Sequence, residues 1–193
     1  MRCIVLCLIF ACFFESLRSE EPPPNFILVL VDDLGWMDLT CQGSDFYRTP
    51  NIDRLAREGM RFTDGYSASA VCSPTRASVL TGRSPNRLGV YQWGYPMREE
   101  EVTLAEVLKE NGYTTGHFGK WHLGSVRNAS ASRPGAHGFD RWVSAPNFYE
   151  NGATLSDEGT AVTFEGVESS FIAVDAALEW MKEALQGDQP IFA

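Results

Sequence analysis

The chain has 193 residues, with 25 acidic and 16 basic side chains and a formal net charge of −9. Hydrophobic residues make up 44% of the sequence, which is ordinary for a globular domain and too many for a disordered chain. The negative charge disfavours partners such as nucleic acid and anionic membrane, since both require clustered lysine and arginine. An anionic substrate would therefore have to be bound by cations gathered at one site.

The first segment has the pattern of a secretory signal peptide. Arg2 precedes an apolar run from Cys3 to Phe14, and polar residues follow. The run is too short to span a bilayer as a mature helix, so we expect an exported protein with no stable membrane anchor. An uncleaved N-terminal anchor is the alternative. The predicted organisation is a signal peptide over 1–19, a proline-rich linker over 20–24 and one domain over 25–193.

Cleavage of the signal peptide would leave only Cys41 and Cys72 of the five cysteines. Two cysteines are too few for a disulfide framework. A single bridge between them is the alternative that an exported protein allows.

The first half of the domain predicts one strand and two helices. Residues 26–31 form an apolar run of strand length, which favours a strand buried on both faces. A helix is predicted over 50–58, ended by Gly59, and another over 74–80. The second helix has proline in its first turn and places Cys72 at its N-terminus.

The middle of the chain predicts a further helix and strand. Thr103 and Glu106 form a capping box at the start of a helix that runs to Asn111. A short strand over 113–118 follows. Strands alternating with helices predict a doubly wound, mostly parallel α/β sheet flanked by helices.

The last third predicts a surface loop over 126–138 and an irregular or hairpin segment over 151–166. An amphipathic helix is predicted over 170–185, and a buried strand begins at 190–193. The helix residues expected to face the core are Phe171, Val174, Leu178, Met181 and Leu185.

Two blocks of the sequence bring together side chains with chemical potential. Asp32 and Asp33 follow the first predicted strand, at the strand end where open α/β sheets bind ligands. Taken alone, an Asp-Asp pair is more often a solvated turn or a helix cap. Cys72 opens the run Cys-Ser-Pro-Thr-Arg, which closes at Arg76.

A third block, Gly-Lys-Trp-His over 119–122, contains Lys120 and His122 and follows the strand over 113–118. In this order the three blocks resemble the signatures of the type I sulfatases, which belong to the alkaline phosphatase superfamily. The resemblance covers residues 25 to about 140.

The resemblance implies a metal and a modified cysteine. Asp32 and Asp33 would bind one divalent ion, Ca²⁺, because adjacent carboxylates suit a hard cation. Cys72 would be converted to formylglycine by a generating enzyme that reads Cys-x-Pro-x-Arg, here with Pro74 and Arg76. Cys72 would then be a metal ligand as well, and a bridge to Cys41 would be excluded. One hydroxyl of the aldehyde hydrate attacks sulfur, and the second allows sulfate to leave.

The resemblance also implies roles for three cationic or titratable residues. Arg76 would hold the hydrate oxygen and the carboxylates in register, and Lys120 would bind a sulfate oxygen. His122 would take the proton of the second hydroxyl. Outside this context Lys120 would be an exposed lysine and His122 a loop or core histidine. We expect His117 and His137 to be structural. Four further residues are candidates for a substrate pocket: Arg83, Tyr91, Trp93 and Asn147.

The sequence departs from the family pattern on its C-terminal side. No Asp-Asn pair follows to complete the metal site, and no later His and Lys pair of the family pattern follows to hold the leaving-group oxygen. We therefore expect an incomplete, truncated catalytic domain that is inactive alone and binds metal weakly or not at all.

The full-length protein is expected to cleave sulfate esters, with a sulfated polysaccharide preferred over a steroid or small aryl sulfate. Its compartment would be extracellular, periplasmic or lysosomal. The alternatives are a phosphonate or phosphodiester hydrolase of the same superfamily and a secreted binding fragment without turnover.

Overall fold

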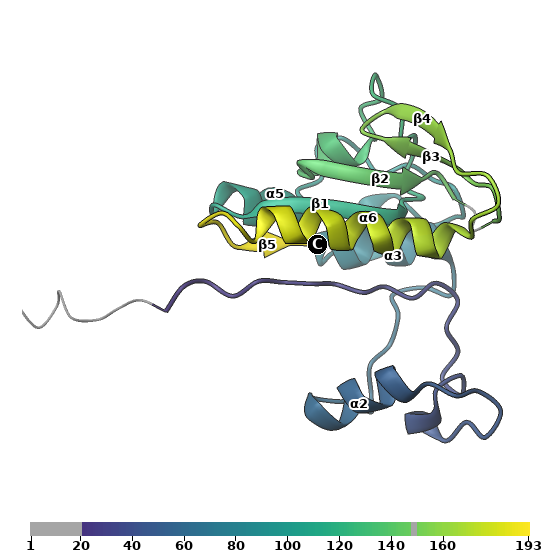
Figure 1. Ribbon diagram of the computed structural model, residues 1–193. Coiled ribbons are helices and arrows are strands. Elements are labelled where there is room, and N and C mark those ends of the chain that lie inside the picture. The colour runs from purple at the N-terminus through teal and green to yellow at the C-terminus, as the bar shows by residue number, and fades with distance from the viewer. Residues whose placement is uncertain (1–20, 148–149) are drawn as a thin grey trace, which may run out of the picture.

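The computed structural model describes residues 21–147 and 150–193 (Figure 1). The predicted signal peptide lies outside the described residues. Within them, none of the helices combines the length and the apolar character that crossing a bilayer requires.

Five strands form one mixed sheet in the order β4-β3-β2-β1-β5. Strand β1 pairs in parallel with β2 on one side and with β5 on the other, while β3 and β4 form an antiparallel hairpin beyond β2. The hairpin confirms the prediction for 151–166, and the strand predicted over 113–118 extends to Lys120. The strands are β1 (Thr114–Lys120), β2 (Arg141–Ala145), β3 (Thr154–Asp157), β4 (Thr160–Thr163) and β5 (Ile191–Phe192).

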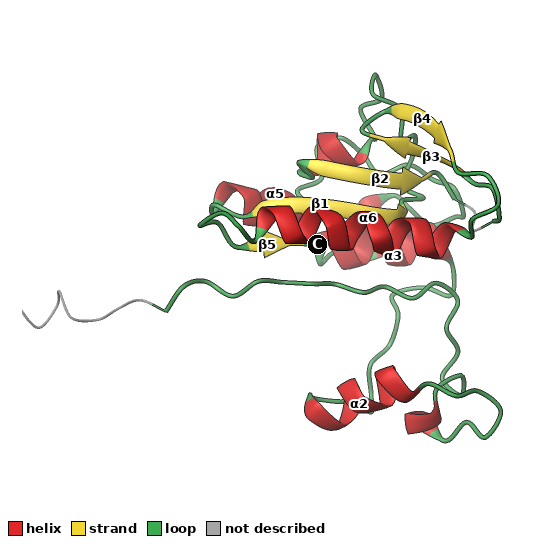
Figure 2. Cartoon of the chain, in the orientation of Figure 1, coloured by secondary structure: helices red, strands yellow, loops and turns green. Residues whose placement is uncertain are grey.

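Helices cover both faces of the sheet (Figure 2). Successive side chains of β1 point to opposite faces, as in any strand. Phe118 packs into a cluster with Val143 and with Ile172 of α6 (Ser169–Ala184). His117 instead contacts the rings of Trp121 and Phe139, which belong to the second cluster, with α3 (Cys72–Thr81) and α5 (Leu104–Glu110). The predicted doubly wound α/β architecture is confirmed.

The helices predicted over 50–58 and 74–80 are present as α2 (Pro50–Glu58) and α3, and Cys72 is the first residue of α3. Helix α2 lies apart from the sheet (Figure 1), and none of its residues is buried. The short remaining helices are η1 (Thr40–Gln42), α4 (Pro85–Leu88) and η2 (Pro134–His137), the last of which interrupts the loop predicted over 126–138.

The prediction of a strand buried on both faces at 26–31 is wrong. This segment runs along β5, where Phe26 and Leu28 donate backbone hydrogen bonds to Ile191 and Ala193, each 2.8 Å long. Residues 27–31 are exposed. Strand β5 lies between this segment and β1. Beyond Leu28, the segment has no strand partner among the described residues.

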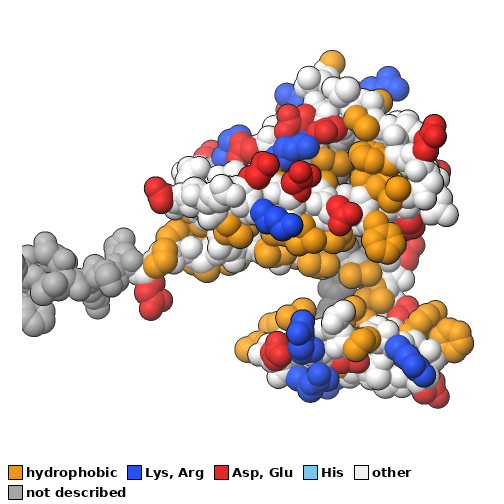
Figure 3. Space-filling model, viewed as in Figure 1, with side chains coloured by type: hydrophobic (Ala, Val, Ile, Leu, Met, Phe, Trp, Pro, Cys, Tyr) orange, Lys and Arg blue, Asp and Glu red, His pale blue; other side chains and the backbone are white. Residues whose placement is uncertain are grey.

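The predicted core face of α6 is also wrong. Its stripe of Phe171, Val174, Leu178 and Leu185 is exposed, while Ile172 and Ala173 are buried against the sheet. The helix is apolar on two sides, and the side that packs on the strands is the one that carries Ile172 and Ala173. Val174 and Leu178 of the stripe, together with half-buried Met181, instead line a cavity of about 730 Å³ that residues 27–31 also line. Apolar side chains also gather along this part of the surface in Figure 3.

The capping box of α5 provides a test of the fold. The Thr103 hydroxyl accepts from Glu106 N–H (3.2 Å) and donates to the carbonyl of His137 (2.8 Å), and Thr103 is buried. We expect Thr103→Ala to lower the free energy of unfolding by about 1–2 kcal/mol, measured by urea denaturation. Thr103→Ser should recover most of the loss, and exposed Thr160→Ala should cost little. Equal stability of the Thr103→Ala and wild-type chains would contradict this account.

Candidate active site

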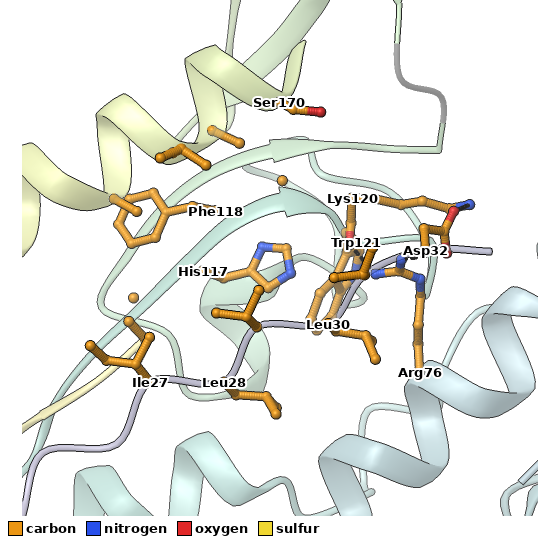
Figure 4. Close-up of a pocket in the computed structure, with 18 of the residues that line it drawn as sticks. Ile27, Leu28, Leu30, Asp32, Arg76, His117, Phe118, Lys120, Trp121 and Ser170 are labelled. Carbon is orange, nitrogen blue, oxygen red and sulfur yellow. Dashed lines mark hydrogen bonds and ion pairs between the residues drawn. The ribbon is translucent and has the colours of Figure 1, made fainter. Parts of the chain in front are cut away.

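The centre of the site is the carboxylate of Asp32, which two cations share (Figure 4). Arg76 Nη2 donates to Asp32 Oδ1 at 2.7 Å, and Lys120 Nζ donates to Oδ2 at 2.6 Å. Arg76 Nη1 also donates to the backbone carbonyl of Lys120 at 2.6 Å. All three side chains are largely buried. Three sequence-predicted residues, far apart in the chain, therefore meet in one hydrogen-bonded group.

Local structure explains these positions. Residue 72 begins α3, so Arg76 lies one turn into the helix and points back along it. Lys120 is the last residue of β1, at the carboxyl end where parallel sheets bind ligands. Burial raises the pKa of Asp32, but the hydrogen bonds and charges of Lys120 and Arg76 outweigh it and hold this pKa below 3.8. Asp32 is therefore ionised at neutral pH.

Cys72 lies next to this group. Its Sγ is 3.4 Å from Lys120 Nζ, and one ligand atom each from Cys72, Asp32 and Asp33 lies within 4.8 Å of the others. Cys72 and Cys41 are both free, so the alternative of a disulfide between them is contradicted.

The carboxylate oxygens beside Cys72 fit a hard divalent cation. Asp33 has a backbone φ of 54°, a left-handed conformation that is uncommon outside glycine and that clusters at functional sites. Asp32 and Asp33 would hold such an ion, and residue 72 faces the same point.

His122 lies beside the site in a buried position. It also has a φ of 54°, and it is only 4% exposed. Neither ring nitrogen has a hydrogen-bond partner among the described residues, and the ring packs edge-on against Trp93 with centroids 4.8 Å apart. Burial, followed by the charges of Lys120 and Arg76, lowers the pKa of His122 to about 4, although Asp32 acts in the opposite direction. His122 is thus a neutral base at pH 7.

The remaining candidates are the two histidines expected to be structural, His117 and His137, and the four residues proposed for a substrate pocket. His117 bonds Ser144 Oγ through Nδ1 (2.8 Å), and His137 is fully buried, in keeping with structural roles. Arg83 pairs with buried Glu101. Asn147 is buried, with its amide nitrogen unpaired among the described residues, whereas Tyr91 and Trp93 are exposed.

Sequence reasoning missed Ser73. Its buried hydroxyl accepts a hydrogen bond from Gly94 N–H at 2.9 Å. The residue stands next to Cys72, but nothing in the sequence pairs it with a loop some twenty residues away.

The cavity of about 730 Å³ opens onto the site. Figure 4 shows Asp32, Arg76 and Lys120 gathered at one end, while Ile27 and Phe118 line the other. The polar group therefore borders a largely apolar space.

The sulfatase family model matches residues 24–193. This chain belongs to the sulfatase family. Over 160 residues it is 43% identical to rat (Rattus norvegicus) steryl-sulfatase, covering 75% of this chain and 27% of that protein. It is 37% identical over 206 residues to human (Homo sapiens) arylsulfatase A, covering 88% and 40%. Dog (Canis lupus familiaris) N-acetylgalactosamine-6-sulfatase is 44% identical over 138 residues, covering 65% and 26%.

Two solved structures have the same fold over most of this chain. The structure of Ps i-CgsB in complex with k-i-k-neocarrahexaose superposes with a TM-score of 0.80 at 28% identity, covering 88% of this chain and 43% of that one. A protein in complex with its substrate D-glucosamine-2-N,6-O-disulfate gives 0.77 at 27% identity, covering 88% and 33%. The chain thus spans between a quarter and a half of the length of these relatives.

The shared carboxylate makes a prediction for stability. Asp32→Asn leaves Arg76 and Lys120 buried side by side without their anion, so we expect a loss of about 3 kcal/mol in the free energy of unfolding. Asp33→Asn, at the exposed neighbouring position, should change it by less than about 0.5 kcal/mol. Urea denaturation with chelator present measures both. Equal effects of the two changes would rule out the arrangement described.

The histidines make a prediction for pH. In the folded chain the pKa values of His117 and His122 are lowered to about 3 and about 4, mainly by burial, from 6.5. Between about pH 4 and 6.5 the unfolded chain therefore binds more protons, so the free energy of unfolding should rise with pH across this window.

Urea denaturation at pH 4.5, 5.5 and 6.5 measures that rise. His122→Asn should make it shallower, whereas an unchanged slope would show that His122 is not buried as a neutral ring.

Proposed function

We propose that the full-length protein hydrolyses sulfate monoesters at the site built around Asp32. The observation that carries the proposal is the position of Cys72, whose Sγ is 3.4 Å from the ammonium of Lys120, itself fixed on Asp32. A nucleophile at residue 72 would attack a group whose oxygens face a buried cation, which stabilises negative charge that develops there.

The residues of this chain supply the remaining steps of the proposal. Lys120 binds a sulfate oxygen, and Arg76 orients Asp32 and Lys120 through its two hydrogen bonds. His122, neutral at pH 7, accepts a proton during release of sulfate. The N-terminus of α3 favours negative charge at residue 72.

We further propose that Cys72 becomes formylglycine through a generating enzyme and that Asp32, Asp33 and residue 72 bind Ca²⁺. Bound there, the cation favours the ionised form of the nucleophile and draws negative charge toward the site. Calcium takes six to eight oxygen ligands, so the ligands of this chain are too few for strong binding. The 193 residues alone should be inactive or nearly so.

The preferred substrate is a sulfated carbohydrate. We also propose that the protein is exported from the cell. Support comes from the name of one relative, N-acetylgalactosamine-6-sulfatase, and from the two sugar complexes among the similar structures. A steroid sulfate is the second candidate, because steryl-sulfatase is also a relative.

A phosphonate ester is a weaker alternative. A phosphonate monoester hydrolase superposes on 63% of this chain with a TM-score of 0.50 at 26% identity. Two structures that superpose better, with TM-scores of 0.80 and 0.77, are the sugar complexes named above.

The first test is mass spectrometry of the peptide that contains Cys72, from protein produced together with a formylglycine-generating enzyme. We expect a loss of about 18 Da, the replacement of the thiol by an aldehyde. Arg76→Ala should abolish the loss, because the recognition pattern is broken, whereas Arg83→Ala, outside the pattern, should retain it. An unmodified Cys72 in the wild-type chain would contradict the proposal.

A further inference from the structure

Three aromatic rings stand in solvent beside the site. Tyr91 is 57% exposed, Trp93 55% and Tyr95 38%, at every second position of one loop. Large exposed apolar groups gathered in one place commonly mark a binding surface. The loop is flanked by Val90 and Met97, both buried, so it is short and held at both ends.

The loop is attached to the two segments that carry the proposed chemistry. Gly94 N–H donates to the buried hydroxyl of Ser73, the residue after Cys72. Met97 N–H donates to the carbonyl of Leu123, the residue after His122, at 3.0 Å. These bonds fix the aromatic rings relative to the nucleophile and to the proposed base.

The rings themselves have a defined arrangement. Trp93 packs edge-on against His122, with centroids 4.8 Å apart. The ring centroids of Tyr91 and Tyr95 lie 6.1 Å apart and the ring planes are inclined at 59°. The two rings are therefore tilted toward each other rather than stacked in parallel. Gly94 has a φ of 77°, a left-handed conformation that turns the loop between Trp93 and Tyr95.

The surface of the loop is uncharged. Residues 89–96 read Gly-Val-Tyr-Gln-Trp-Gly-Tyr-Pro and contain no acidic or basic side chain. The loop itself therefore offers no cation to a second sulfate group, although Arg98, just past its end, lies close enough to Tyr91 to interact with it electrostatically. The loop surface suits the apolar face of a ring, because aromatic side chains offer large, rigid contact area.

We propose that Tyr91, Trp93 and Tyr95 form a subsite that binds the uncharged ring carrying the sulfate ester. The proposal rests on the proposed function, since it places the ring of a substrate whose sulfate contacts Lys120. A pyranose and an aryl ring share the required chemistry, an apolar face with one sulfate group attached. The subsite would discriminate between substrates by their ring, while Lys120 and Asp32 supply the anion site.

The experiment compares the binding of three probes to the chain in Ca²⁺-containing buffer: inorganic sulfate, galactose 6-sulfate and 4-nitrophenyl sulfate. Dissociation constants come from NMR titration of the backbone amides of residues 72, 73, 75 and 76, since Pro74 has no amide hydrogen. Trp93→Ala and the double variant Tyr91→Ala/Tyr95→Ala are compared with Tyr66→Ala, which removes a ring that is 88% exposed outside the loop. The double variant leaves the contact between Trp93 and His122 in place.

We expect the wild-type chain to bind at least one ring ester more tightly than inorganic sulfate. Both loop variants should weaken the binding of that ester about threefold to tenfold, with inorganic sulfate and the Tyr66→Ala variant unchanged. Whichever ester responds identifies the ring as a sugar or an aryl group.

Two outcomes would overturn the proposal, and only the second would also contradict the proposed function. If sulfate and the esters bind but the loop variants bind the esters as tightly as wild type does, the ring subsite is wrong and the proposed function stands. If none of the three probes binds the wild-type chain, the anion site fails, and the ring subsite fails with it.

Discussion

The structure depends most on the sharing of one carboxylate by two buried cations. Asp32 follows the extended segment 26–31, Arg76 lies in α3 and Lys120 ends β1, so their contacts join three segments far apart in the sequence. Burying Arg76 or Lys120 alone would cost several kcal/mol. Asp32 offsets that cost and fixes where both cations point. Lys120 reaches Cys72 because Asp32 and the backbone hold it there.

The same group controls the charge state of its surroundings. Two cations near His122 add to burial and keep the imidazole neutral, while they keep Asp32 ionised. A neutral base, an anion and two cations therefore lie together in a chain whose net charge is −9. The cations act locally, so the proposed sulfate ester would meet positive charge at this site in spite of the acidity of the whole chain.

The sequence predicts well what depends on local chemistry. The helix predicted from Thr103 to Asn111 rests on a capping box and the one predicted over 74–80 on its proline, and both are present, as α5 and α3. It predicts poorly what depends on a packing partner. The stripe Phe171–Leu185 and the run 26–31 have the apolar patterns of buried surfaces, but such a pattern does not say what covers them.

Strand β2 is not predicted from the sequence because its five residues lack alternation and follow a loop. The proposed site residues were found from short motifs, whereas the bond between Ser73 and Gly94 is a tertiary contact with no local signal.

The most direct test of this account is a crystal structure of the protein with formylglycine at residue 72, grown with Ca²⁺ and sulfate. We expect a cation at 2.3–2.6 Å from oxygens of Asp32 and Asp33, typical of calcium, with a sulfate oxygen against Lys120 Nζ and Arg76 still bonded to Asp32. A cation bound away from both carboxylates, or a sulfate bound away from Lys120, would contradict the account.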